Sequence, residues 1–271
     1  MVSSRPRLFT TEAVVLRHSD IGEADRLLWL LTPQRGVIRA TARGSRKPAS
    51  KLGGHIDLLC YVKLSMREGR ELHSVNQADT IDAFRAVRTD IGRLSRGLYM
   101  AELAQRVSVE DAPAPAVFQL LIKSLQWLTD TENADTLVRW FALRLLTVTG
   151  FKPEFGACAE CGDELDPGDH VFSAERGGLI CPQCRSQGSD VLQPANLSTI
   201  KVLRHLARSD FPMVSALNIG SEERRQTERI LRSHTNTVVD RGVRSSAFLD
   251  EVRDWPEDGP VPGGMRSDFL T

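Results

Sequence analysis

Two short cysteine pairs constrain this chain more than any other feature of its sequence. Each pair has the form Cys-x-x-Cys, and nineteen residues separate the pairs, which comprise Cys158, Cys161, Cys181 and Cys184. A tight turn of the form Cys-x-x-Cys places its two thiolates on one side of the turn. Two such turns complete the tetrahedral ligand shell of a zinc ion. Four thiolates leave no open coordination position, so the spacing predicts one structural Zn²⁺ ion. Unligated thiols and two redox-active pairs remain the other interpretations.

The composition narrows the class of protein further. The chain has 271 residues, with 35 Lys+Arg against 35 Asp+Glu and 41% hydrophobic residues, which is typical of folded soluble domains. No run of about eighteen apolar residues occurs, so no membrane partner is expected. Five cysteines are too few for a disulfide scaffold, and the first residues lack a secretion-signal pattern. We therefore expect a cytoplasmic protein.

The first eighty residues have the pattern of short β-strands. Strands are predicted over residues 11–18, 25–31, 37–41, 57–65 and 71–75. Five short strands in this length favour a small barrel, and the five-stranded OB-fold is the candidate. The sequence thus predicts an OB-fold nucleic-acid-binding domain over residues 1–80.

After Thr80 the spacing of apolar residues changes from two to about 3.6, the helical period. One helix is predicted over residues 84–101, two more over 117–128 and 137–148, and shorter ones from Ser198 and from Ser221. Residues 81–252 are therefore expected to form a helical domain, with a zinc-ribbon-like module inserted at about 156–190. The Pro- and Gly-rich residues 253–271 are expected to be a disordered tail. The predicted fold class is α+β, multidomain.

A basic segment lies within the predicted barrel. Residues 35–51 carry six basic side chains and no acidic one, and residues 1–80 carry thirteen basic and eight acidic residues. Flexible backbone with unneutralised cations suits binding to phosphates. The candidate DNA-binding residues are Arg39, Arg43, Arg46, Lys47 and Lys51, with Ser45 and Ser50 as possible hydroxyl donors. A solvated loop whose charges only aid solubility is the other interpretation.

The other candidate residues do not indicate a catalytic site. Cys60 lies in an apolar strand pattern and is expected to be a small buried hydrophobe. Trp29, Tyr61 and Phe9 are expected in the barrel core and not on a base-stacking surface. No nucleotide-binding or hydrolase motif is present, and the six histidines do not cluster with carboxylates. We therefore predict no catalytic residues and no enzyme activity.

A series of short segments along the chain has a specific order. It includes Thr11-Glu-Ala-Val-Val-Leu, Gly22-Glu-Ala-Asp-Arg-Leu, Leu31-Thr-Pro-Gln-Arg-Gly and the basic segment from Ala42. It continues from Leu145 to Gly162, resumes at Phe172-Ser-Ala-Glu-Arg-Gly-Gly-Leu-Ile-Cys, and is faint at Arg244-Ser-Ser-Ala-Phe-Leu. No single motif is unique, but in this order the series resembles the RecO family of bacterial DNA repair proteins.

The resemblance implies an OB-fold, a helical domain and a zinc module. It implies binding to single- and double-stranded DNA, annealing of complementary strands, and association with the nucleoid. The implied partners are RecR and the single-stranded-DNA-binding protein, with which the family helps load the RecA recombinase. The five basic residues named above match the family's basic N-terminal segment.

Two alternative functions remain open at the level of the sequence. The first is a zinc-ribbon accessory factor of transcription or translation, in which the cysteine module meets the nucleic acid. Residues 156–190 carry seven acidic and two basic residues, which would repel phosphate and disfavour this interpretation. The second is a nucleic-acid enzyme that uses scattered carboxylates, and nuclease activity that depends on magnesium would favour it.

Overall fold

The computed structural model describes residues 7–186, 188, 190–239 and 252, and it divides into two compact units. The first contains the strands and helices up to Thr131, and the second begins at Glu132. The predicted boundary at residue 80 stays a prediction. The predicted tail at 253–271 and the faint family match from Arg244 lie outside the described residues.

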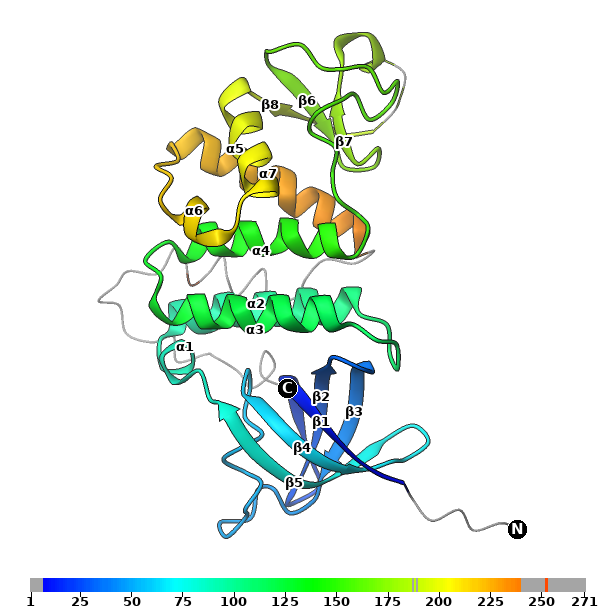
Figure 1. The fold of residues 1–271 in the computed structure, drawn as a ribbon, viewed down its shortest axis with the longest axis vertical. Helices are drawn as coiled ribbons and strands as arrows, with labels where there is room; N and C mark the ends of the chain where they lie inside the picture. Colours follow the sequence, from blue (N-terminus) through cyan, green and yellow to red (C-terminus); the bar gives the residue numbers. More distant parts are fainter. Residues whose placement is uncertain (1–6, 187, 189, 240–251, 253–271) are drawn as a thin grey trace. The chain divides into compact units, whose positions relative to one another are not determined.

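Five strands of the first unit form a closed barrel (Figure 1). They are β1 (Leu8–Ile21), β2 (Asp25–Thr32), β3 (Gly36–Ala42), β4 (Tyr61–Arg67) and β5 (His73–Asp82). The order around the barrel is β1-β2-β3-β5-β4, and β1 closes it by pairing with β4 through its first half and β2 through its second. All neighbours are antiparallel except β3 and β5. This confirms the predicted five-stranded OB-fold barrel.

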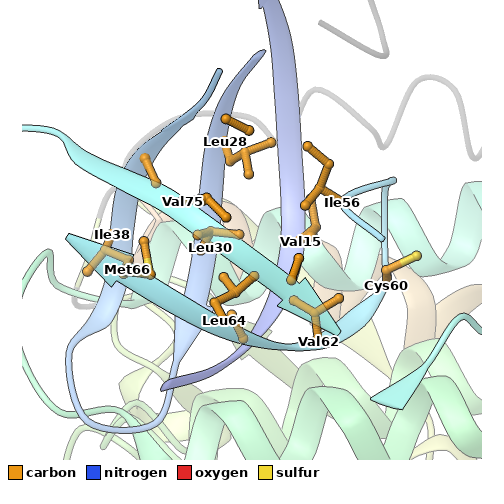
Figure 2. Packing of buried hydrophobic residues seen from close by; sticks show 14 residues of the cluster. Val15, Leu28, Leu30, Ile38, Ile56, Cys60, Val62, Leu64, Met66 and Val75 are labelled. Carbon is orange, nitrogen blue, oxygen red and sulfur yellow. The ribbon is translucent and has the colours of Figure 1, made fainter. Parts of the chain in front are cut away.

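Alternation along the strands builds the barrel core (Figure 2). In β2, Leu28 and Leu30 are fully buried in the core cluster, so Leu27 and Trp29 project from the opposite face of the strand. Cys60 is also fully buried there, as predicted, and burial raises the pKa of its thiol. The expectation that Trp29 is a core residue is wrong, since this side chain is half-buried on the outer face.

Three predicted elements differ from the structure. The strand predicted at 71–75 is β5, which begins at His73 and continues to Asp82. The strand predicted at 57–65 begins only at Tyr61, because the preceding residues form a turn in which Leu59 has φ 63°. The helix predicted over 84–101 is divided into α1 (Arg85–Thr89) and α2 (Ile91–Val107). The division lies at Asp90, whose backbone is extended. Its side-chain carboxylate caps α2 by accepting a hydrogen bond from the backbone N–H of Arg93 at 2.8 Å.

Helices α1, α2 and α3 (Pro115–Asp130) belong to the same compact unit as the barrel. Tyr61 of β4 meets Phe118 of α3 edge to face at 5.9 Å. The loop that joins α2 to α3 lies against the β2–β3 turn, where the backbone N–H of Ala114 donates to the carbonyl of Pro33 at 3.1 Å. Outer barrel residues near this turn, such as Val14 and Leu31, are therefore fully buried.

The second unit contains four helices and a small sheet among its described residues. The helices are α4 (Ala134–Val148), α5 (Leu197–Arg208), α6 (Phe211–Ser215) and α7 (Ser221–Val238), and the strands are β6 (His170–Ser173), β7 (Gly178–Ile180) and β8 (Leu192–Ala195). The predictions for α4, α5 and α7 are confirmed, while α6 and β8 were not predicted. In the described part of the chain, no helix has the length and apolar character needed to span a bilayer.

Candidate metal centre and nucleic-acid interface

The four predicted ligands come together in the second unit. Cys158 and Cys161 lie in a turn before β6. Cys181 directly precedes the short 3₁₀ helix η1 (Pro182–Cys184), which follows β7, and Cys184 is the last residue of that helix. The four sulfur atoms lie within 4.8 Å of one another, and those of Cys161 and Cys181 are 3.8 Å apart. Sulfurs on a tetrahedral zinc ion, each about 2.3 Å from the metal, would be about 3.8 Å apart. The donor set and spacing therefore fit a metal with four thiolate ligands.

The backbone around Cys158 favours the thiolate form of this one cysteine. Burial by itself would raise the pKa of the Cys158 thiol, but N–H groups of Cys181 and Cys161 donate to it and lower its pKa to about 6. The Cys181 N–H lies 3.3 Å from the Cys158 sulfur. The pKa of Cys184 is raised, first by its hydrogen bond with the Cys181 thiol. Four adjacent thiolates repel one another, so the four cysteines cannot all be ionised unless a cation lies among them. A bound metal ion supplies that cation.

A largely buried ion pair holds the second cysteine turn. The guanidinium of Arg176 binds both carboxylate oxygens of Asp190, at 3.0 and 2.9 Å, and donates to the carbonyl of Cys184 at 3.2 Å. Glu160, between the first two cysteines, lies 3.6 Å from the same guanidinium. Arg176 therefore links both cysteine turns to the loop that follows them.

The five predicted DNA-binding residues lie on β3 and the loop after it, but two of them already have acidic partners. Arg39 on β3 pairs with Glu110 at 3.0 Å. Arg46 pairs with Asp20 at 3.1 Å and also donates to the carbonyls of Gly22 and Glu23. Both pairs are partly exposed to solvent, where ion pairs contribute little and a competing phosphate can replace the carboxylate.

The other three predicted residues are exposed cations. Arg43, Lys47 and Lys51 are exposed, and none forms an ion pair with another described residue. Their loop is held by its backbone, since the Gly44 N–H donates to Asp25 at 2.7 Å and the Arg46 N–H to the Ala24 carbonyl at 3.0 Å. This part of the segment therefore forms hydrogen-bonded turns that carry the cations, and the expected flexibility of its backbone stays a prediction.

The two serines of the basic segment differ in their exposure. Ser45 is buried, with 4% of its surface exposed, so its hydroxyl is not accessible to a phosphate. Ser50 is partly exposed, and its hydroxyl oxygen accepts a hydrogen bond from the Leu52 N–H at 3.2 Å. Its O–H is still able to donate, so the expectation for Ser50 stays a prediction.

Sequence reasoning missed one pair of residues beside this surface. The guanidinium of Arg17 on β1 lies over the indole of Trp29 on β2, 4.6 Å from the ring centroid. The signal was present in the alternation of β2, which predicts that Leu28 and Leu30 share one face and Trp29 the other. Only the strand register shows that Arg17 lies directly opposite Trp29.

These observations define a class: an OB-fold protein with a basic barrel surface, an α-helical part and a cluster of four cysteines that could hold a metal ion. The family model for the N-terminal part of recombination protein O matches residues 7–84, and the model for its C-terminal part matches residues 88–247. The chain belongs to the RecO family.

Individual relatives support the same assignment over nearly the full length. The chain is 35% identical to a DNA repair protein RecO of Dehalococcoides mccartyi over 249 residues, which cover 92% of this chain and 98% of the relative. It is 39% identical to the protein of the same name from Roseiflexus sp., with 92% of this chain and 87% of the relative covered. The protein of that name from Desulforudis audaxviator is 34% identical, at 90% and 97% coverage.

Proposed function

We propose that this protein binds DNA through the basic barrel surface and acts in recombinational repair. The observation that carries the proposal is the group of exposed cations Arg43, Lys47 and Lys51 on a loop whose backbone forms hydrogen-bonded turns. Neutralising phosphates releases condensed counterions, so such a surface binds nucleic acid with little dependence on sequence. Family membership and relatives named as DNA repair proteins support the same role.

The proposed activity is annealing of complementary strands, which requires no bond chemistry. Two single strands repel each other because both are polyanions. A surface that neutralises phosphates on both strands lowers that barrier and leaves the base edges free to pair. The partners we propose, from the family resemblance, are single- and double-stranded DNA, RecR and the single-stranded-DNA-binding protein, with RecA loaded as a result.

The metal centre has a structural role in this proposal. Cys158, Cys161, Cys181 and Cys184 would hold one Zn²⁺ ion, which would fix the two turns relative to each other. The surrounding residues 156–190 carry a net charge of five negative, so this module does not suit direct contact with phosphate. This observation disfavours a zinc-ribbon factor that reads nucleic acid through its cysteine turns.

The salt dependence of single-strand binding tests the proposal. If about four phosphates are neutralised, the logarithm of the association constant for oligo-dT should fall with log salt at a slope of about −3. Replacing Arg43, Lys47 and Lys51 together by alanine should flatten the slope to about −1, because three contacts are lost.

A charge-matched variant provides the control. Alanine at Lys63, Arg67 and Arg70, which are exposed on β4 and the turn after it, removes the same charge from another part of the barrel. This variant should retain the steep slope. Equal flattening in both variants, or an unchanged slope in the first, would contradict the assignment of the loop. Strand annealing without added metal or nucleotide, and no cleavage with Mg²⁺, would separate this function from a nuclease.

A further inference from the structure

The outer face of β1, β2 and β3 carries a row of three side chains at one register position. Arg17 of β1 is opposite Trp29 of β2, and Trp29 is opposite Arg39 of β3. All three are half-buried, and the Arg17 guanidinium lies 4.6 Å from the centre of the indole. A tryptophan is thus placed between two cations on a strand surface.

The rows on either side show where this position lies on the barrel. In the row toward the β2–β3 turn, Val14, Leu31 and Val37 are opposite one another and buried, although they lie outside the barrel core. In the row on the other side, Leu27 is opposite Ser19 and Thr41, and all three are half-buried. Trp29 therefore marks the point at which the outer face changes from buried to accessible surface.

We propose that Trp29, with Arg17 over its ring, is a stacking platform for an unpaired base, so that this surface binds single strands through bases as well as phosphates. This inference rests on the proposed function, because it places a base beside the phosphates that the basic loop contacts. An indole and a guanidinium plane both stack on bases of any identity. The ligand class is single-stranded nucleic acid of unrestricted sequence.

The charge around the platform favours a polyanion as its occupant. Arg17 and Arg39 lie beside Trp29 in the row, and Arg43 follows the end of β3 directly. Arg39 pairs with Glu110 at 3.0 Å, but this ion pair is partly exposed, and a phosphate can replace the carboxylate. The one acid of β2 is Asp25, and its carboxylate already accepts the hydrogen bond from the Gly44 N–H. In a duplex the base faces are stacked inside the helix, so the platform contributes only when the strand is single.

Two ligands of equal charge separate stacking from phosphate binding. The first is oligo-dT, and the second is an abasic oligonucleotide of the same length, which keeps the phosphates but lacks the bases. Trp29→Leu preserves apolar bulk and removes the aromatic face. It should weaken oligo-dT binding about tenfold, with no change in abasic binding or in the salt slope, because base–aromatic stacking is strong and does not involve charge.

A matched control and a conservative variant complete the experiment. Trp127 on α3 is also half-buried with a cation over its ring, since the Lys123 ammonium lies 4.8 Å from the centroid, so Trp127→Leu is the control. Trp29→Phe keeps an aromatic face and should retain most of the preference for oligo-dT. Circular dichroism and thermal melting of each variant establish that it is folded.

The outcomes distinguish the platform from the proposed function. Oligo-dT binding by Trp29→Leu at the wild-type level, or an equal loss for both ligands, would overturn the platform and leave the role of the loop intact. A wild-type protein that binds neither ligand would instead contradict the proposed function itself. Selective loss for oligo-dT in Trp29→Leu, but not in Trp127→Leu, supports the platform.

Discussion

Gly36, the first residue of β3, shows how strongly one position constrains the first unit. Its φ of +55° is in the left-handed region, and a Cβ atom there would lie 2.4 Å from the carbonyl oxygen of Ala112 and 2.6 Å from that of Val109. Both contacts are with backbone, which cannot turn aside as a side chain can. The α2–α3 loop can therefore approach the β2–β3 turn only because residue 36 has no side chain.

Gly36→Ala is expected to lower the free energy of unfolding by about 3 kcal/mol or more, since backbone strain and a steric clash act together. Urea unfolding followed by circular dichroism measures the change. Gly22 is a matched control, because its φ is +56° and a Cβ atom added there would have no atom within 4 Å. Gly22→Ala should cost only about 1 kcal/mol. Equal losses would mean that the loop contact contributes nothing.

Among the elements, those with strong local patterns were predicted well from the sequence. The apolar periodicity of residues 117–128 and 137–148 predicted α3 and α4, and the spacing of the cysteines predicted which four sulfurs converge. The short α6 and β8 had no comparable signal. At Asp90 a side-chain cap divides a continuous apolar stripe, and apolar spacing does not show such a break.

The candidate nucleic-acid site also has a part that the sequence predicts and a part that it does not. A run of cations without acids is visible in the sequence, but the acids that pair with Arg39 and Arg46 come from other elements. Glu110 is 71 residues away from Arg39 along the chain. The neighbours of Trp29 likewise depend on strand register, which follows from tertiary packing and not from local composition.

The cysteine module supplies a prediction for one element. We expect one zinc ion per chain by elemental analysis, and none after Cys158→Ser with Cys181→Ser, since each turn then loses a ligand. Amide exchange should rise in β6, β7 and η1, where the two turns join the sheet, and stay unchanged in the barrel. A wild-type chain free of metal, or equal exchange before and after the substitutions, would contradict the structural role.

At the scale of the whole molecule, an equal number of acidic and basic residues conceals an uneven distribution. The chain has 35 of each, yet residues 1–80 have an excess of five positive charges and residues 156–190 an excess of five negative ones. The net charge of the chain therefore does not show which part of the molecule binds a polyanion. The distribution of the charged residues along the chain determines this.

Two histidines of the barrel predict how the stability of the protein depends on pH. Burial, followed by the nearby Arg26, lowers the pKa of His18, and burial, followed by Arg35, lowers that of His73. Below about pH 6.5 the unfolded chain takes up protons that the folded chain does not bind, so stability falls as the pH drops through this range. The urea midpoint should therefore be lower at pH 5.5 than at pH 7.5.

The double variant His18→Gln, His73→Asn should reduce this pH dependence. Asparagine can accept the hydrogen bond that the backbone N–H of Gly69 donates to Nδ1 of His73. Both proteins should carry the metal, so that protonation of the cysteine ligands affects them equally. A midpoint that changes as much in the variant as in the wild type would exclude the histidines as the cause.

The parallel pairing of β3 with β5 has a consequence for how the barrel forms and opens. In the described strands it consists of two residue pairs, Ala40 with His73 and Thr41 with Ser74, whereas the hairpin between β2 and β3 has seven. The paired residues of β3 and β5 are about thirty residues apart along the chain. Closing this loop costs more conformational entropy than closing the β2–β3 hairpin, and it forms fewer residue pairs. We infer that this pairing of β3 with β5 opens first in the native state, while the β1–β2–β3 meander stays intact.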